Sequence, residues 1–134
     1  MNYLFKEEPA NYSFDDLMRD GGTSWTGVKN PVAQRHLRGV KKGDRVFFYH
    51  TGNEKAVIGI CRAAGDAYAD PKDKTGKLYA VDMEPVKKLA SPVTLAAIKA
   101  DRRFASFELT RLPRLSVMPV PPETWDAIVK MSQG

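Results

Sequence analysis

Cysteine and histidine are scarce in this sequence, which has one Cys, Cys61, and two His among 134 residues. A single thiol excludes an internal disulfide, and one Cys with two His does not supply the ligands of a usual zinc site. We therefore expect no metal, no cofactor and a reducing compartment. That compartment is the cytoplasm, or the nucleus in a eukaryote.

Long hydrophobic runs are also missing. No stretch approaches the roughly 18 apolar residues that suggest a membrane-spanning helix, and the first residues lack the basic and apolar regions of a signal peptide. The sequence thus predicts no membrane partner. With 43% hydrophobic and 28% charged residues the composition is that of a globular protein, and the length fits one domain over residues 1–134.

Sequence motifs of known catalytic sites are absent as well. The chain has no glycine-rich phosphate loop, no Gly-x-Ser-x-Gly elbow and no His-Glu-x-x-His pair. Cys61 lies among Ile58, Ile60 and Ala63, which is typical of a buried, unreactive thiol. We expect a binding module and not an enzyme.

Positive charge, in contrast, is concentrated in one segment. Residues 29–45 hold six of the 21 Lys and Arg residues and one of the 16 Asp and Glu residues, so this segment accounts for the net charge of +5. Such a cluster predicts contacts with phosphates, which give affinity and salt dependence without reading bases. A solvated basic face is the alternative. The predicted phosphate-binding residues are Lys29, Arg35, Arg38, Lys41, Lys42 and Arg45.

A lone aromatic residue, Trp25, stands just before this basic segment, in a stretch that contains Gly27. A flat aromatic side chain beside a basic helix suits an anionic chain with bases that stack. Packing in the core is the alternative for Trp25. For Trp125, which shares an apolar helical face with Ile128 and Val129, core packing is the interpretation that we favour.

The order of periodic segments predicts an α+β fold with a curved or barrel-like sheet flanked by short helices. Ser13 and Asn30 have the chemistry of helix N-caps, and Gly21-Gly22 and Gly39 are expected to end those helices. Further helices are predicted over Thr94–Ala100 and from Pro121 onward. The predicted strands are Asn2–Lys6, Arg45–His50, Ala56–Ala64, Leu78–Leu89 and Arg114–Val120.

Several short motifs in one order cover nearly the whole chain. They are Lys6-Glu7-Glu8-Pro9 with Tyr12-Ser13, Trp25-Thr26-Gly27-Val28-Lys29-Asn30, Gln34 with Leu37-Arg38, Lys42-Gly43-Asp44, Phe48-Tyr49-His50-Thr51, Gly59, Asp70-Pro71, Leu95 with Ile98-Lys99, and Arg114-Leu115-Ser116-Val117 with Pro119-Val120. In this set the chain resembles the EVE domain family, a branch of the PUA-like superfamily. Glu7 departs from the family pattern, where Ser is common, and Lys29 stands where Arg is frequent.

The resemblance implies a PUA-like small closed β-barrel flanked by short helices, with an aromatic-walled pocket. EVE domains look like readers of modified nucleobases, such as methylated or hydroxymethylated cytosine, and are similar in fold to YTH domains. The expected partner is therefore nucleic acid, DNA or RNA, that carries a modified base. A separate nuclease that depends on this recognition of the modified base is a further possible partner, which the sequence leaves open.

The residue patterns and the resemblance together predict the pocket. Asn30 is needed as a helix cap, whereas Gln34, one turn later, is freer to offer a donor and an acceptor to a base edge. Lys6 and Glu7 alternate along a strand, so only one of them faces the pocket. The predicted base-binding residues are Lys6, Glu7, Tyr12, Trp25, Thr26, Asn30, Gln34, His50, Tyr68, Asp70, Arg114 and Ser116.

Each of these residues also has a structural alternative. His50, Tyr12 and Gln34 serve equally well as packed or exposed residues, and Tyr68 and Asp70 lie in a polar loop. Two other functions stay open. One is a general RNA-binding PUA-like module, and the other is a small hydrolase similar to ASCH relatives that acts on a modified nucleoside. A hydrolase would bring Lys6, Glu7, Tyr12 and His50 together.

Overall fold

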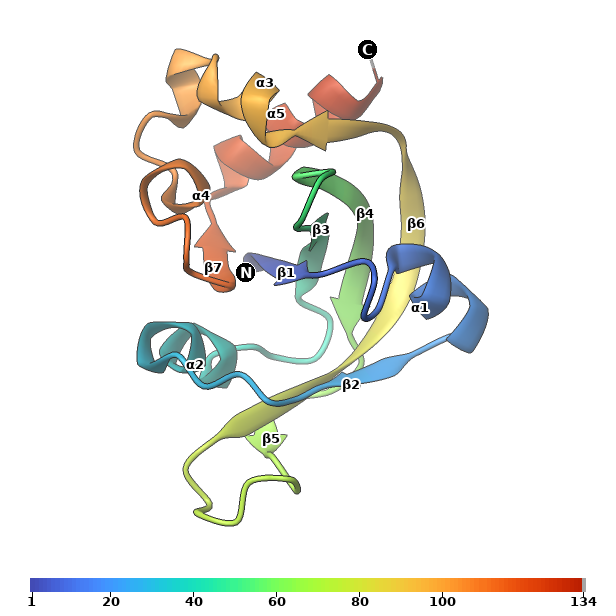
Figure 1. The fold of residues 1–134 in the computed structure, drawn as a ribbon, viewed down its shortest axis with the longest axis vertical. Helices are drawn as coiled ribbons and strands as arrows, with labels where there is room; N and C mark the ends of the chain where they lie inside the picture. The colour runs from blue at the N-terminus through green and yellow to red at the C-terminus, as the bar shows by residue number, and fades with distance from the viewer. Residues whose placement is uncertain (134) are drawn as a thin grey trace.

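The computed structural model describes residues 1–133, which form one curled sheet with short helices around it (Figure 1). This confirms the predicted mixed α+β class. The strands are β1 (Asn2–Glu7), β2 (Thr23–Trp25), β3 (Arg45–His50), β4 (Ala56–Ala63), β5 (Tyr68–Ala69), β6 (Tyr79–Thr94) and β7 (Val117–Val120). The helices are α1 (Phe14–Asp20), α2 (Pro31–Arg38), α3 (Leu95–Lys99), η1 (Arg102–Phe104), α4 (Glu108–Arg111) and α5 (Pro122–Gln133).

Hydrogen bonds order the sheet as β2-β6-β4-β3-β1-β7, with β5 paired to β6 outside this path. β1 runs parallel to β3, and the other pairs are antiparallel. The path has two ends, β2 and β7, so the described strands form a half-barrel and not the closed barrel that the resemblance implied. Helix α2 contacts both β7 and β6, and lies between the two ends of the sheet.

The 16-residue strand β6 gives the sheet its curl. Its register against β4 shifts twice, between Val57 and Gly59 and between Ile60 and Cys61, and such bulges bend a strand and increase its twist. Pro85 pairs with Cys61 at the second shift, where a missing backbone N–H is tolerated. The strand predicted from the sequence ends at Leu89, five residues short, because a proline near position 92 is typical of a strand end.

Capping groups set the ends of the first two helices as the sequence predicts. The Ser13 hydroxyl accepts from the Asp16 N–H while the Asp16 carboxylate accepts from the Ser13 N–H, and Gly21 ends α1 with φ of 76°. Asn30 Oδ1 accepts from the N–H groups of Val32 and Ala33 at the start of α2. These caps satisfy backbone donors that a helix leaves free.

The core lies on the inner face of the curl and is closed by α5. The Trp125 ring on α5 stacks on Phe47 of β3, with ring centroids 3.7 Å apart and planes 13° apart. Trp125 is buried, as predicted. On the outer side of this pair the Arg45 guanidinium lies 4.7 Å from the indole centroid. This aromatic stack helps to fix the C-terminal helix to the sheet, together with the buried Ile128 and the contact of α5 with β6.

Candidate functional site

A small cavity lies where the end of β1, the residues before α1 and strand β2 meet. Its volume is about 180 Å³, well below the roughly 300–1,000 Å³ of sites for drug-sized ligands. A ligand of single-ring size is what such a space suits. We call it the Trp25 cavity, and its lining residues are Glu7, Tyr12, Thr23, Ser24, Trp25 and Thr26.

Trp25 both lines this cavity and packs in the core. It is the last residue of β2 and is 7% exposed. Its indole lies 5.3 Å from the Phe5 ring and 5.5 Å from the Phe48 ring, the second contact being edge-on at 85°. The two alternatives that the sequence offered for Trp25 thus coexist, because neighbouring rings hold one part of the indole while another part borders the cavity.

Glu7 and Lys6 diverge at the end of β1, as strand alternation requires. Glu7 lines the Trp25 cavity, whereas Lys6 Nζ donates to the Pro113 carbonyl at 3.0 Å. Burial raises the pKa of the Glu7 carboxyl, and the Glu8 carboxylate adds to the rise, while hydrogen bonds from the Glu8 backbone and Asn11 oppose it. Burial lowers the pKa of the Lys6 ammonium. Of the two, Glu7 is therefore the side chain available to a ligand in this cavity.

Tyr12 and Thr26 border the same cavity and are held from outside it. The Tyr12 hydroxyl donates to Asp20 at 2.8 Å; burial first, and then this bond, raise its pKa. Thr26 Oγ1 accepts from Lys72 Nζ at 3.4 Å. Thr23 and Ser24 also line the cavity and were not predicted, because a three-residue strand leaves no periodic signal in the sequence.

The segment after Trp25 is pinned by two buried polar side chains. Asp70 accepts from the Gly27 N–H at 3.0 Å, and Gly27 has φ of 74°, which favours glycine. Gln34 is 2% exposed, and its Nε2 donates to the carbonyls of Val28 and Tyr79 while Oε1 accepts from the Tyr79 N–H. Gln34 thus differs from the free amide that the sequence predicted, since backbone groups engage both of its ends.

His50 and Tyr68 also have structural partners, and neither of them lines the Trp25 cavity. His50 Nε2 accepts from the Phe14 N–H at 3.0 Å, so its Nδ1 carries the proton and donates to Glu54 at 3.0 Å. The Tyr68 hydroxyl donates to Asp82, and this bond raises the pKa of Tyr68. Asp82 also accepts from Ser24, so Tyr68 supports the wall of the Trp25 cavity from behind.

A second cavity, of about 330 Å³, lies at the start of α2 and contains two more of the predicted residues, Asn30 and Arg114. Asn30 Oδ1 is occupied by the helix cap. The backbone carbonyl of Ser116, another predicted residue, accepts a hydrogen bond from the Lys6 N–H at 2.9 Å. We call this space the Arg114 cavity, and it is lined by Asn30, Val32, Leu112, Pro113, Arg114 and Leu115.

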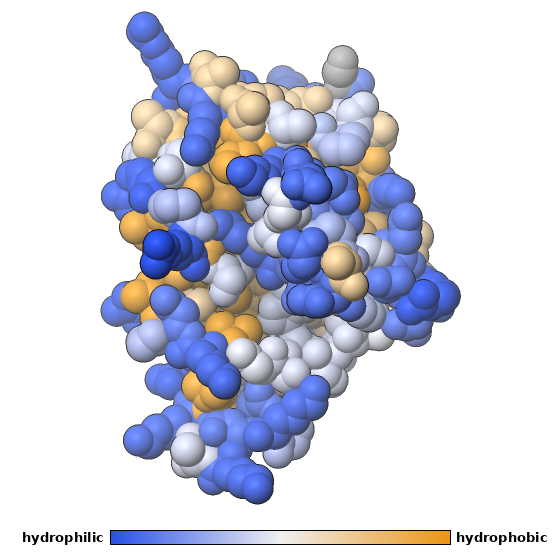
Figure 2. Space-filling view, viewed as in Figure 1, coloured by the Kyte–Doolittle hydropathy of each residue, from blue (hydrophilic) through white to orange (hydrophobic). Residues whose placement is uncertain are grey.

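All six predicted phosphate-binding residues are exposed. None of them forms an ion pair with another residue in the described range 1–133. Arg38 donates to the Lys77 carbonyl and lies over the Tyr79 ring, and Arg45 lies over Trp125, so these two are partly held in place. The hydrophilic surface of the molecule is broken by hydrophobic patches on the face shown in Figure 2.

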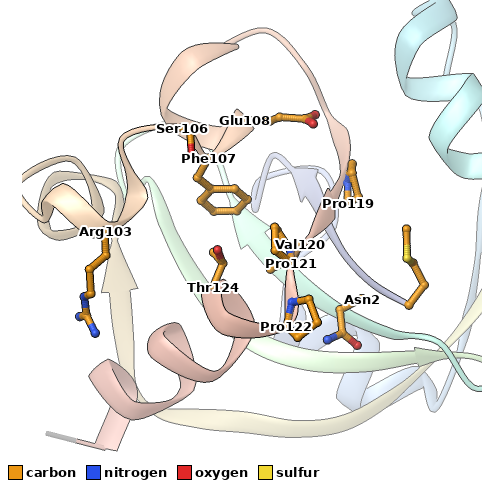
Figure 3. Close-up of a pocket in the computed structure, with 11 residues that line it drawn as sticks. Asn2, Arg103, Ser106, Phe107, Glu108, Pro119, Val120, Pro121, Pro122 and Thr124 are labelled. Carbon is orange, nitrogen blue, oxygen red and sulfur yellow. The ribbon is translucent and has the colours of Figure 1, made fainter.

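A further cavity, of about 350 Å³, lies between the η1–α4 segment, the β7–α5 junction and the N-terminus (Figure 3). Phe107, Val120 and Pro121 give it a largely apolar wall. None of the predicted site residues lines it. Arg103, one of its lining residues, is paired with Asp101 at 2.7 Å.

Metal ligands, membrane-spanning helices and a reactive thiol were also looked for among the described residues. Within residues 1–133 no three His, Cys, Asp or Glu side chains gather as metal ligands, and no helix has the length and apolar character needed to cross a bilayer. Cys61 is buried, and burial raises the pKa of its thiol. Its hydrogen bond to the Val46 carbonyl is a weak one.

Fold and site together define a class of protein, a small α+β domain with an aromatic-bordered cavity at the end of a curled sheet. The family model of the EVE domain matches residues 1–131. The chain belongs to the EVE domain family.

Solved structures and curated proteins show the same relationship. A protein from Rhodopseudomonas palustris, solved by NMR, is 42% identical with a TM-score of 0.94, over 98% of this chain and 92% of that chain. Human THYN1, crystallised in complex with DNA containing 5-methylcytosine, is 25% identical with a TM-score of 0.91, over 99% of this chain and 98% of that chain. In sequence alone, human thymocyte nuclear protein 1 is 25% identical over 166 residues, covering 98% of this chain and 74% of that protein.

A more distant likeness concerns the fold alone. The ASCH protein from Zymomonas mobilis is 14% identical with a TM-score of 0.57, over 97% of this chain and 94% of that chain.

Proposed function

We propose that this protein binds a modified nucleobase in nucleic acid, of the methylated or hydroxymethylated cytosine type, and that the Trp25 cavity receives the base. One observation carries the proposal. Glu7, Tyr12, Trp25 and Thr26 come from three separate segments and border one cavity suited to a single ring. The crystal structure of the related human THYN1 with 5-methylcytosine DNA supports this choice of ligand.

The chemistry of the lining matches a cytosine. A base enters such a cavity only after it leaves its stack, and an aromatic side chain repays part of that cost, about 1–3 kcal/mol per stacked base. Trp25 supplies the aromatic surface. The Glu7 carboxylate is an acceptor for the exocyclic amine of cytosine, a group that thymine and uracil lack. Glu7 therefore favours cytosine over these two bases. The shape of the cavity determines which group on the cytosine ring is accepted.

The exposed basic residues supply the remaining affinity. Lys29, Lys41 and Lys42 have no carboxylate partner within residues 1–133, so they neutralise phosphates without first breaking an ion pair. Phosphate contacts set position and salt dependence but read no base. We assign the two tasks to separate parts of the surface. The Trp25 cavity recognises the base, and the basic segment binds the phosphates.

A binding role, without catalysis, fits the state of the reactive groups. Both ring nitrogens of His50 are engaged, by Phe14 and Glu54, and a base needs a free one. The Cys61 thiol is buried and its pKa is raised, which disfavours the nucleophilic thiolate. Lys6 points away from Glu7, so the four groups of the alternative hydrolase do not surround one cavity.

The test is a set of matched oligonucleotides, single- and double-stranded, with cytosine, 5-methylcytosine or 5-hydroxymethylcytosine at one position. Affinities are measured at two salt concentrations. A preference for a modified base that persists at the higher salt supports the cavity reader. Equal affinities that all fall as the salt concentration rises would indicate a general nucleic-acid-binding surface. The affinities for RNA and DNA oligonucleotides of the same sequence would then be compared.

A further inference from the structure

The Arg114 cavity has an unusual surface for a position exposed to water. Val32 and Leu112, on its two sides, are 37% and 40% exposed. They are two of five large hydrophobic residues that stay exposed in the described chain. With Pro113 they form an apolar surface beside Arg114, on the side of the molecule where Figure 1 shows α2, α4 and β7.

This surface lies next to the Trp25 cavity along the chain and in space. Glu7 lines the Trp25 cavity, and the adjacent Lys6 donates from Nζ to the carbonyl of Pro113, a residue that lines the Arg114 cavity. Thr26 borders the Trp25 cavity and Asn30 the Arg114 cavity. Four residue steps separate them, so their Cα atoms are at most about 14 Å apart. A single strand can therefore reach both cavities at once.

The charges around the Arg114 cavity favour an anionic chain as its occupant. Lys29, Arg111 and Arg114 are exposed, and none of them has a carboxylate partner within residues 1–133. The nearest acid along the chain, Glu108, faces His36 on α2 at 3.7 Å. An apolar surface with unpaired cations at its rim matches a base face and its phosphate, because Leu, Pro and similar side chains pack against bases while Arg contacts phosphate.

We propose that the Arg114 cavity binds the nucleotide next to the read base on the same strand, with its base against Val32, Leu112 and Pro113 and its phosphate at Arg114. This inference rests on the proposed function of the Trp25 cavity. It adds a second contact site to that function, one that is sensitive to the presence of a neighbouring base. We expect the neighbour on one side of the read base only, because the other cavity that borders the site, at Thr23 and Ser24, contains Asp82 and Glu84 and does not suit a phosphate.

Single-stranded oligonucleotides with one 5-methylcytosine test the inference, because they require no duplex opening. An abasic residue replaces the nucleobase on the 5′ side or on the 3′ side, and binding of the full-length protein is measured. We expect a loss of about five- to tenfold at one of the two positions, the lower part of the range for stacking of a base on a side chain. The same abasic residue at the other position has little effect.

Two variants separate the cavity from the rest of the surface. V32S combined with L112S removes apolar contact at exposed positions, so the abasic effect shrinks toward onefold while the preference for 5-methylcytosine over cytosine persists. Val86→Ser is the matched control, since Val86 is 45% exposed on β6 and lines neither cavity. Thermal unfolding verifies that each variant is folded.

The outcomes divide between the two proposals. A wild-type protein that prefers 5-methylcytosine but tolerates abasic residues on both sides overturns the flanking site and leaves the proposed function standing. The flanking site is overturned in the same way if the V32S and L112S variant is as sensitive to the abasic residue as the wild type. A wild type with no preference for the modified base overturns the proposed function, and the flanking site with it.

Discussion

The Gln34 side chain pairs with both backbone groups of Tyr79. Its Nε2 donates to the Tyr79 carbonyl at 3.2 Å, and its Oε1 accepts from the Tyr79 N–H at 2.9 Å. The same nitrogen donates to the Val28 carbonyl at 2.6 Å. One buried amide thus joins α2, β6 and the segment that follows Trp25.

Replacing this amide should destabilise the fold. Gln34→Ala removes a partner from three backbone groups at partly buried positions, and a buried group left unsatisfied costs about 1–3 kcal/mol. Allowing for partial relaxation, we expect the free energy of unfolding to fall by about 2–4 kcal/mol in urea denaturation. The exposed neighbour Arg35 provides the control, Arg35→Ala, which changes it by less than about 0.5 kcal/mol. A stable Gln34→Ala protein that has lost base preference would instead restore the base-edge role predicted from the sequence.

Gly59 on β4 is the point where α1 meets the sheet. A Cβ atom at this position would lie 2.5 Å from the Phe14 ring, which is itself buried and edge-on to Phe48. Gly59→Ala is therefore overpacked and should cost about 1–3 kcal/mol of unfolding free energy. Gly65→Ala, where no atom lies within 4 Å, is the matched control and should be close to neutral. Equal thermal midpoints for the two variants would show that α1 shifts freely.

The Glu7 carboxyl makes stability depend on pH in a definite direction. Burial raises its pKa in the folded protein above the usual 4.5, so the folded state holds the proton more tightly than the unfolded chain. Its contribution to the free energy of unfolding is therefore full below pH 4.5 and is lost as the pH rises through the folded-state pKa.

Glu7→Gln removes this titration and isolates it from other carboxyls, such as Asp16 and Asp73, whose pKa values are lowered by hydrogen bonds. We expect the stability of the wild type relative to Glu7→Gln to decrease from about pH 4 to about pH 7, an interval that begins just below the usual Glu value. Chemical denaturation of both proteins across this range measures the difference. A difference that stays constant would mean that the Glu7 carboxyl is solvated as in the unfolded chain.

The basic segment should set salt dependence alone. For duplex DNA each neutralised phosphate contributes about 0.9 to the slope of log affinity against log salt. Lys41→Gln with Lys42→Gln is therefore expected to reduce the slope by about 2 while the ratio of affinities for modified and unmodified DNA stays constant. The double variant Lys99→Gln and Lys130→Gln, on α3 and α5, controls for net charge. An unchanged slope for the first variant would place the phosphates elsewhere.

Local chemistry made much of this fold predictable from the sequence. Ser13 and Asn30 indicate their own helix starts, because a capping side chain needs only the next few residues. The strand Arg45–His50 was predicted with its observed bounds. Strand β2, in contrast, has three residues and exists because β6 pairs with it at Thr23–Trp25. The open end of the half-barrel likewise depends on where α2 packs, which no local pattern encodes.

Only part of the candidate site was predictable from the sequence. Glu7, Tyr12, Trp25 and Thr26 were all predicted and border one cavity. Gln34, by contrast, has the same chemistry on a base edge as on a backbone, and its choice depends on the long-range approach of Tyr79. Such contacts between distant segments decide which polar residues a fold uses for itself and which it leaves for a ligand.

The signal of the Trp25 indole is a more informative probe of binding than a substitution of Trp25. Trp25→Ala would open a hole between Phe5 and Phe48, and loss of a buried aromatic side chain costs about 3–5 kcal/mol, so a loss of binding would not distinguish the site from the fold. The chain has two Trp residues, so its indole N–H signals report separately on the Trp25 cavity and on the buried Trp125.

The most direct measurement is therefore a pair of NMR titrations of the ¹⁵N-labelled protein, one with an oligonucleotide carrying 5-methylcytosine and one with its cytosine counterpart. We expect the Trp25 indole and the backbone signals of Thr23–Thr26 to shift with the modified oligonucleotide and far less with the unmodified one, while the Trp125 indole stays in place. Shifts that are the same for both oligonucleotides and confined to residues 29–45, with the Trp25 indole unmoved, would contradict the reading of a modified base in this cavity.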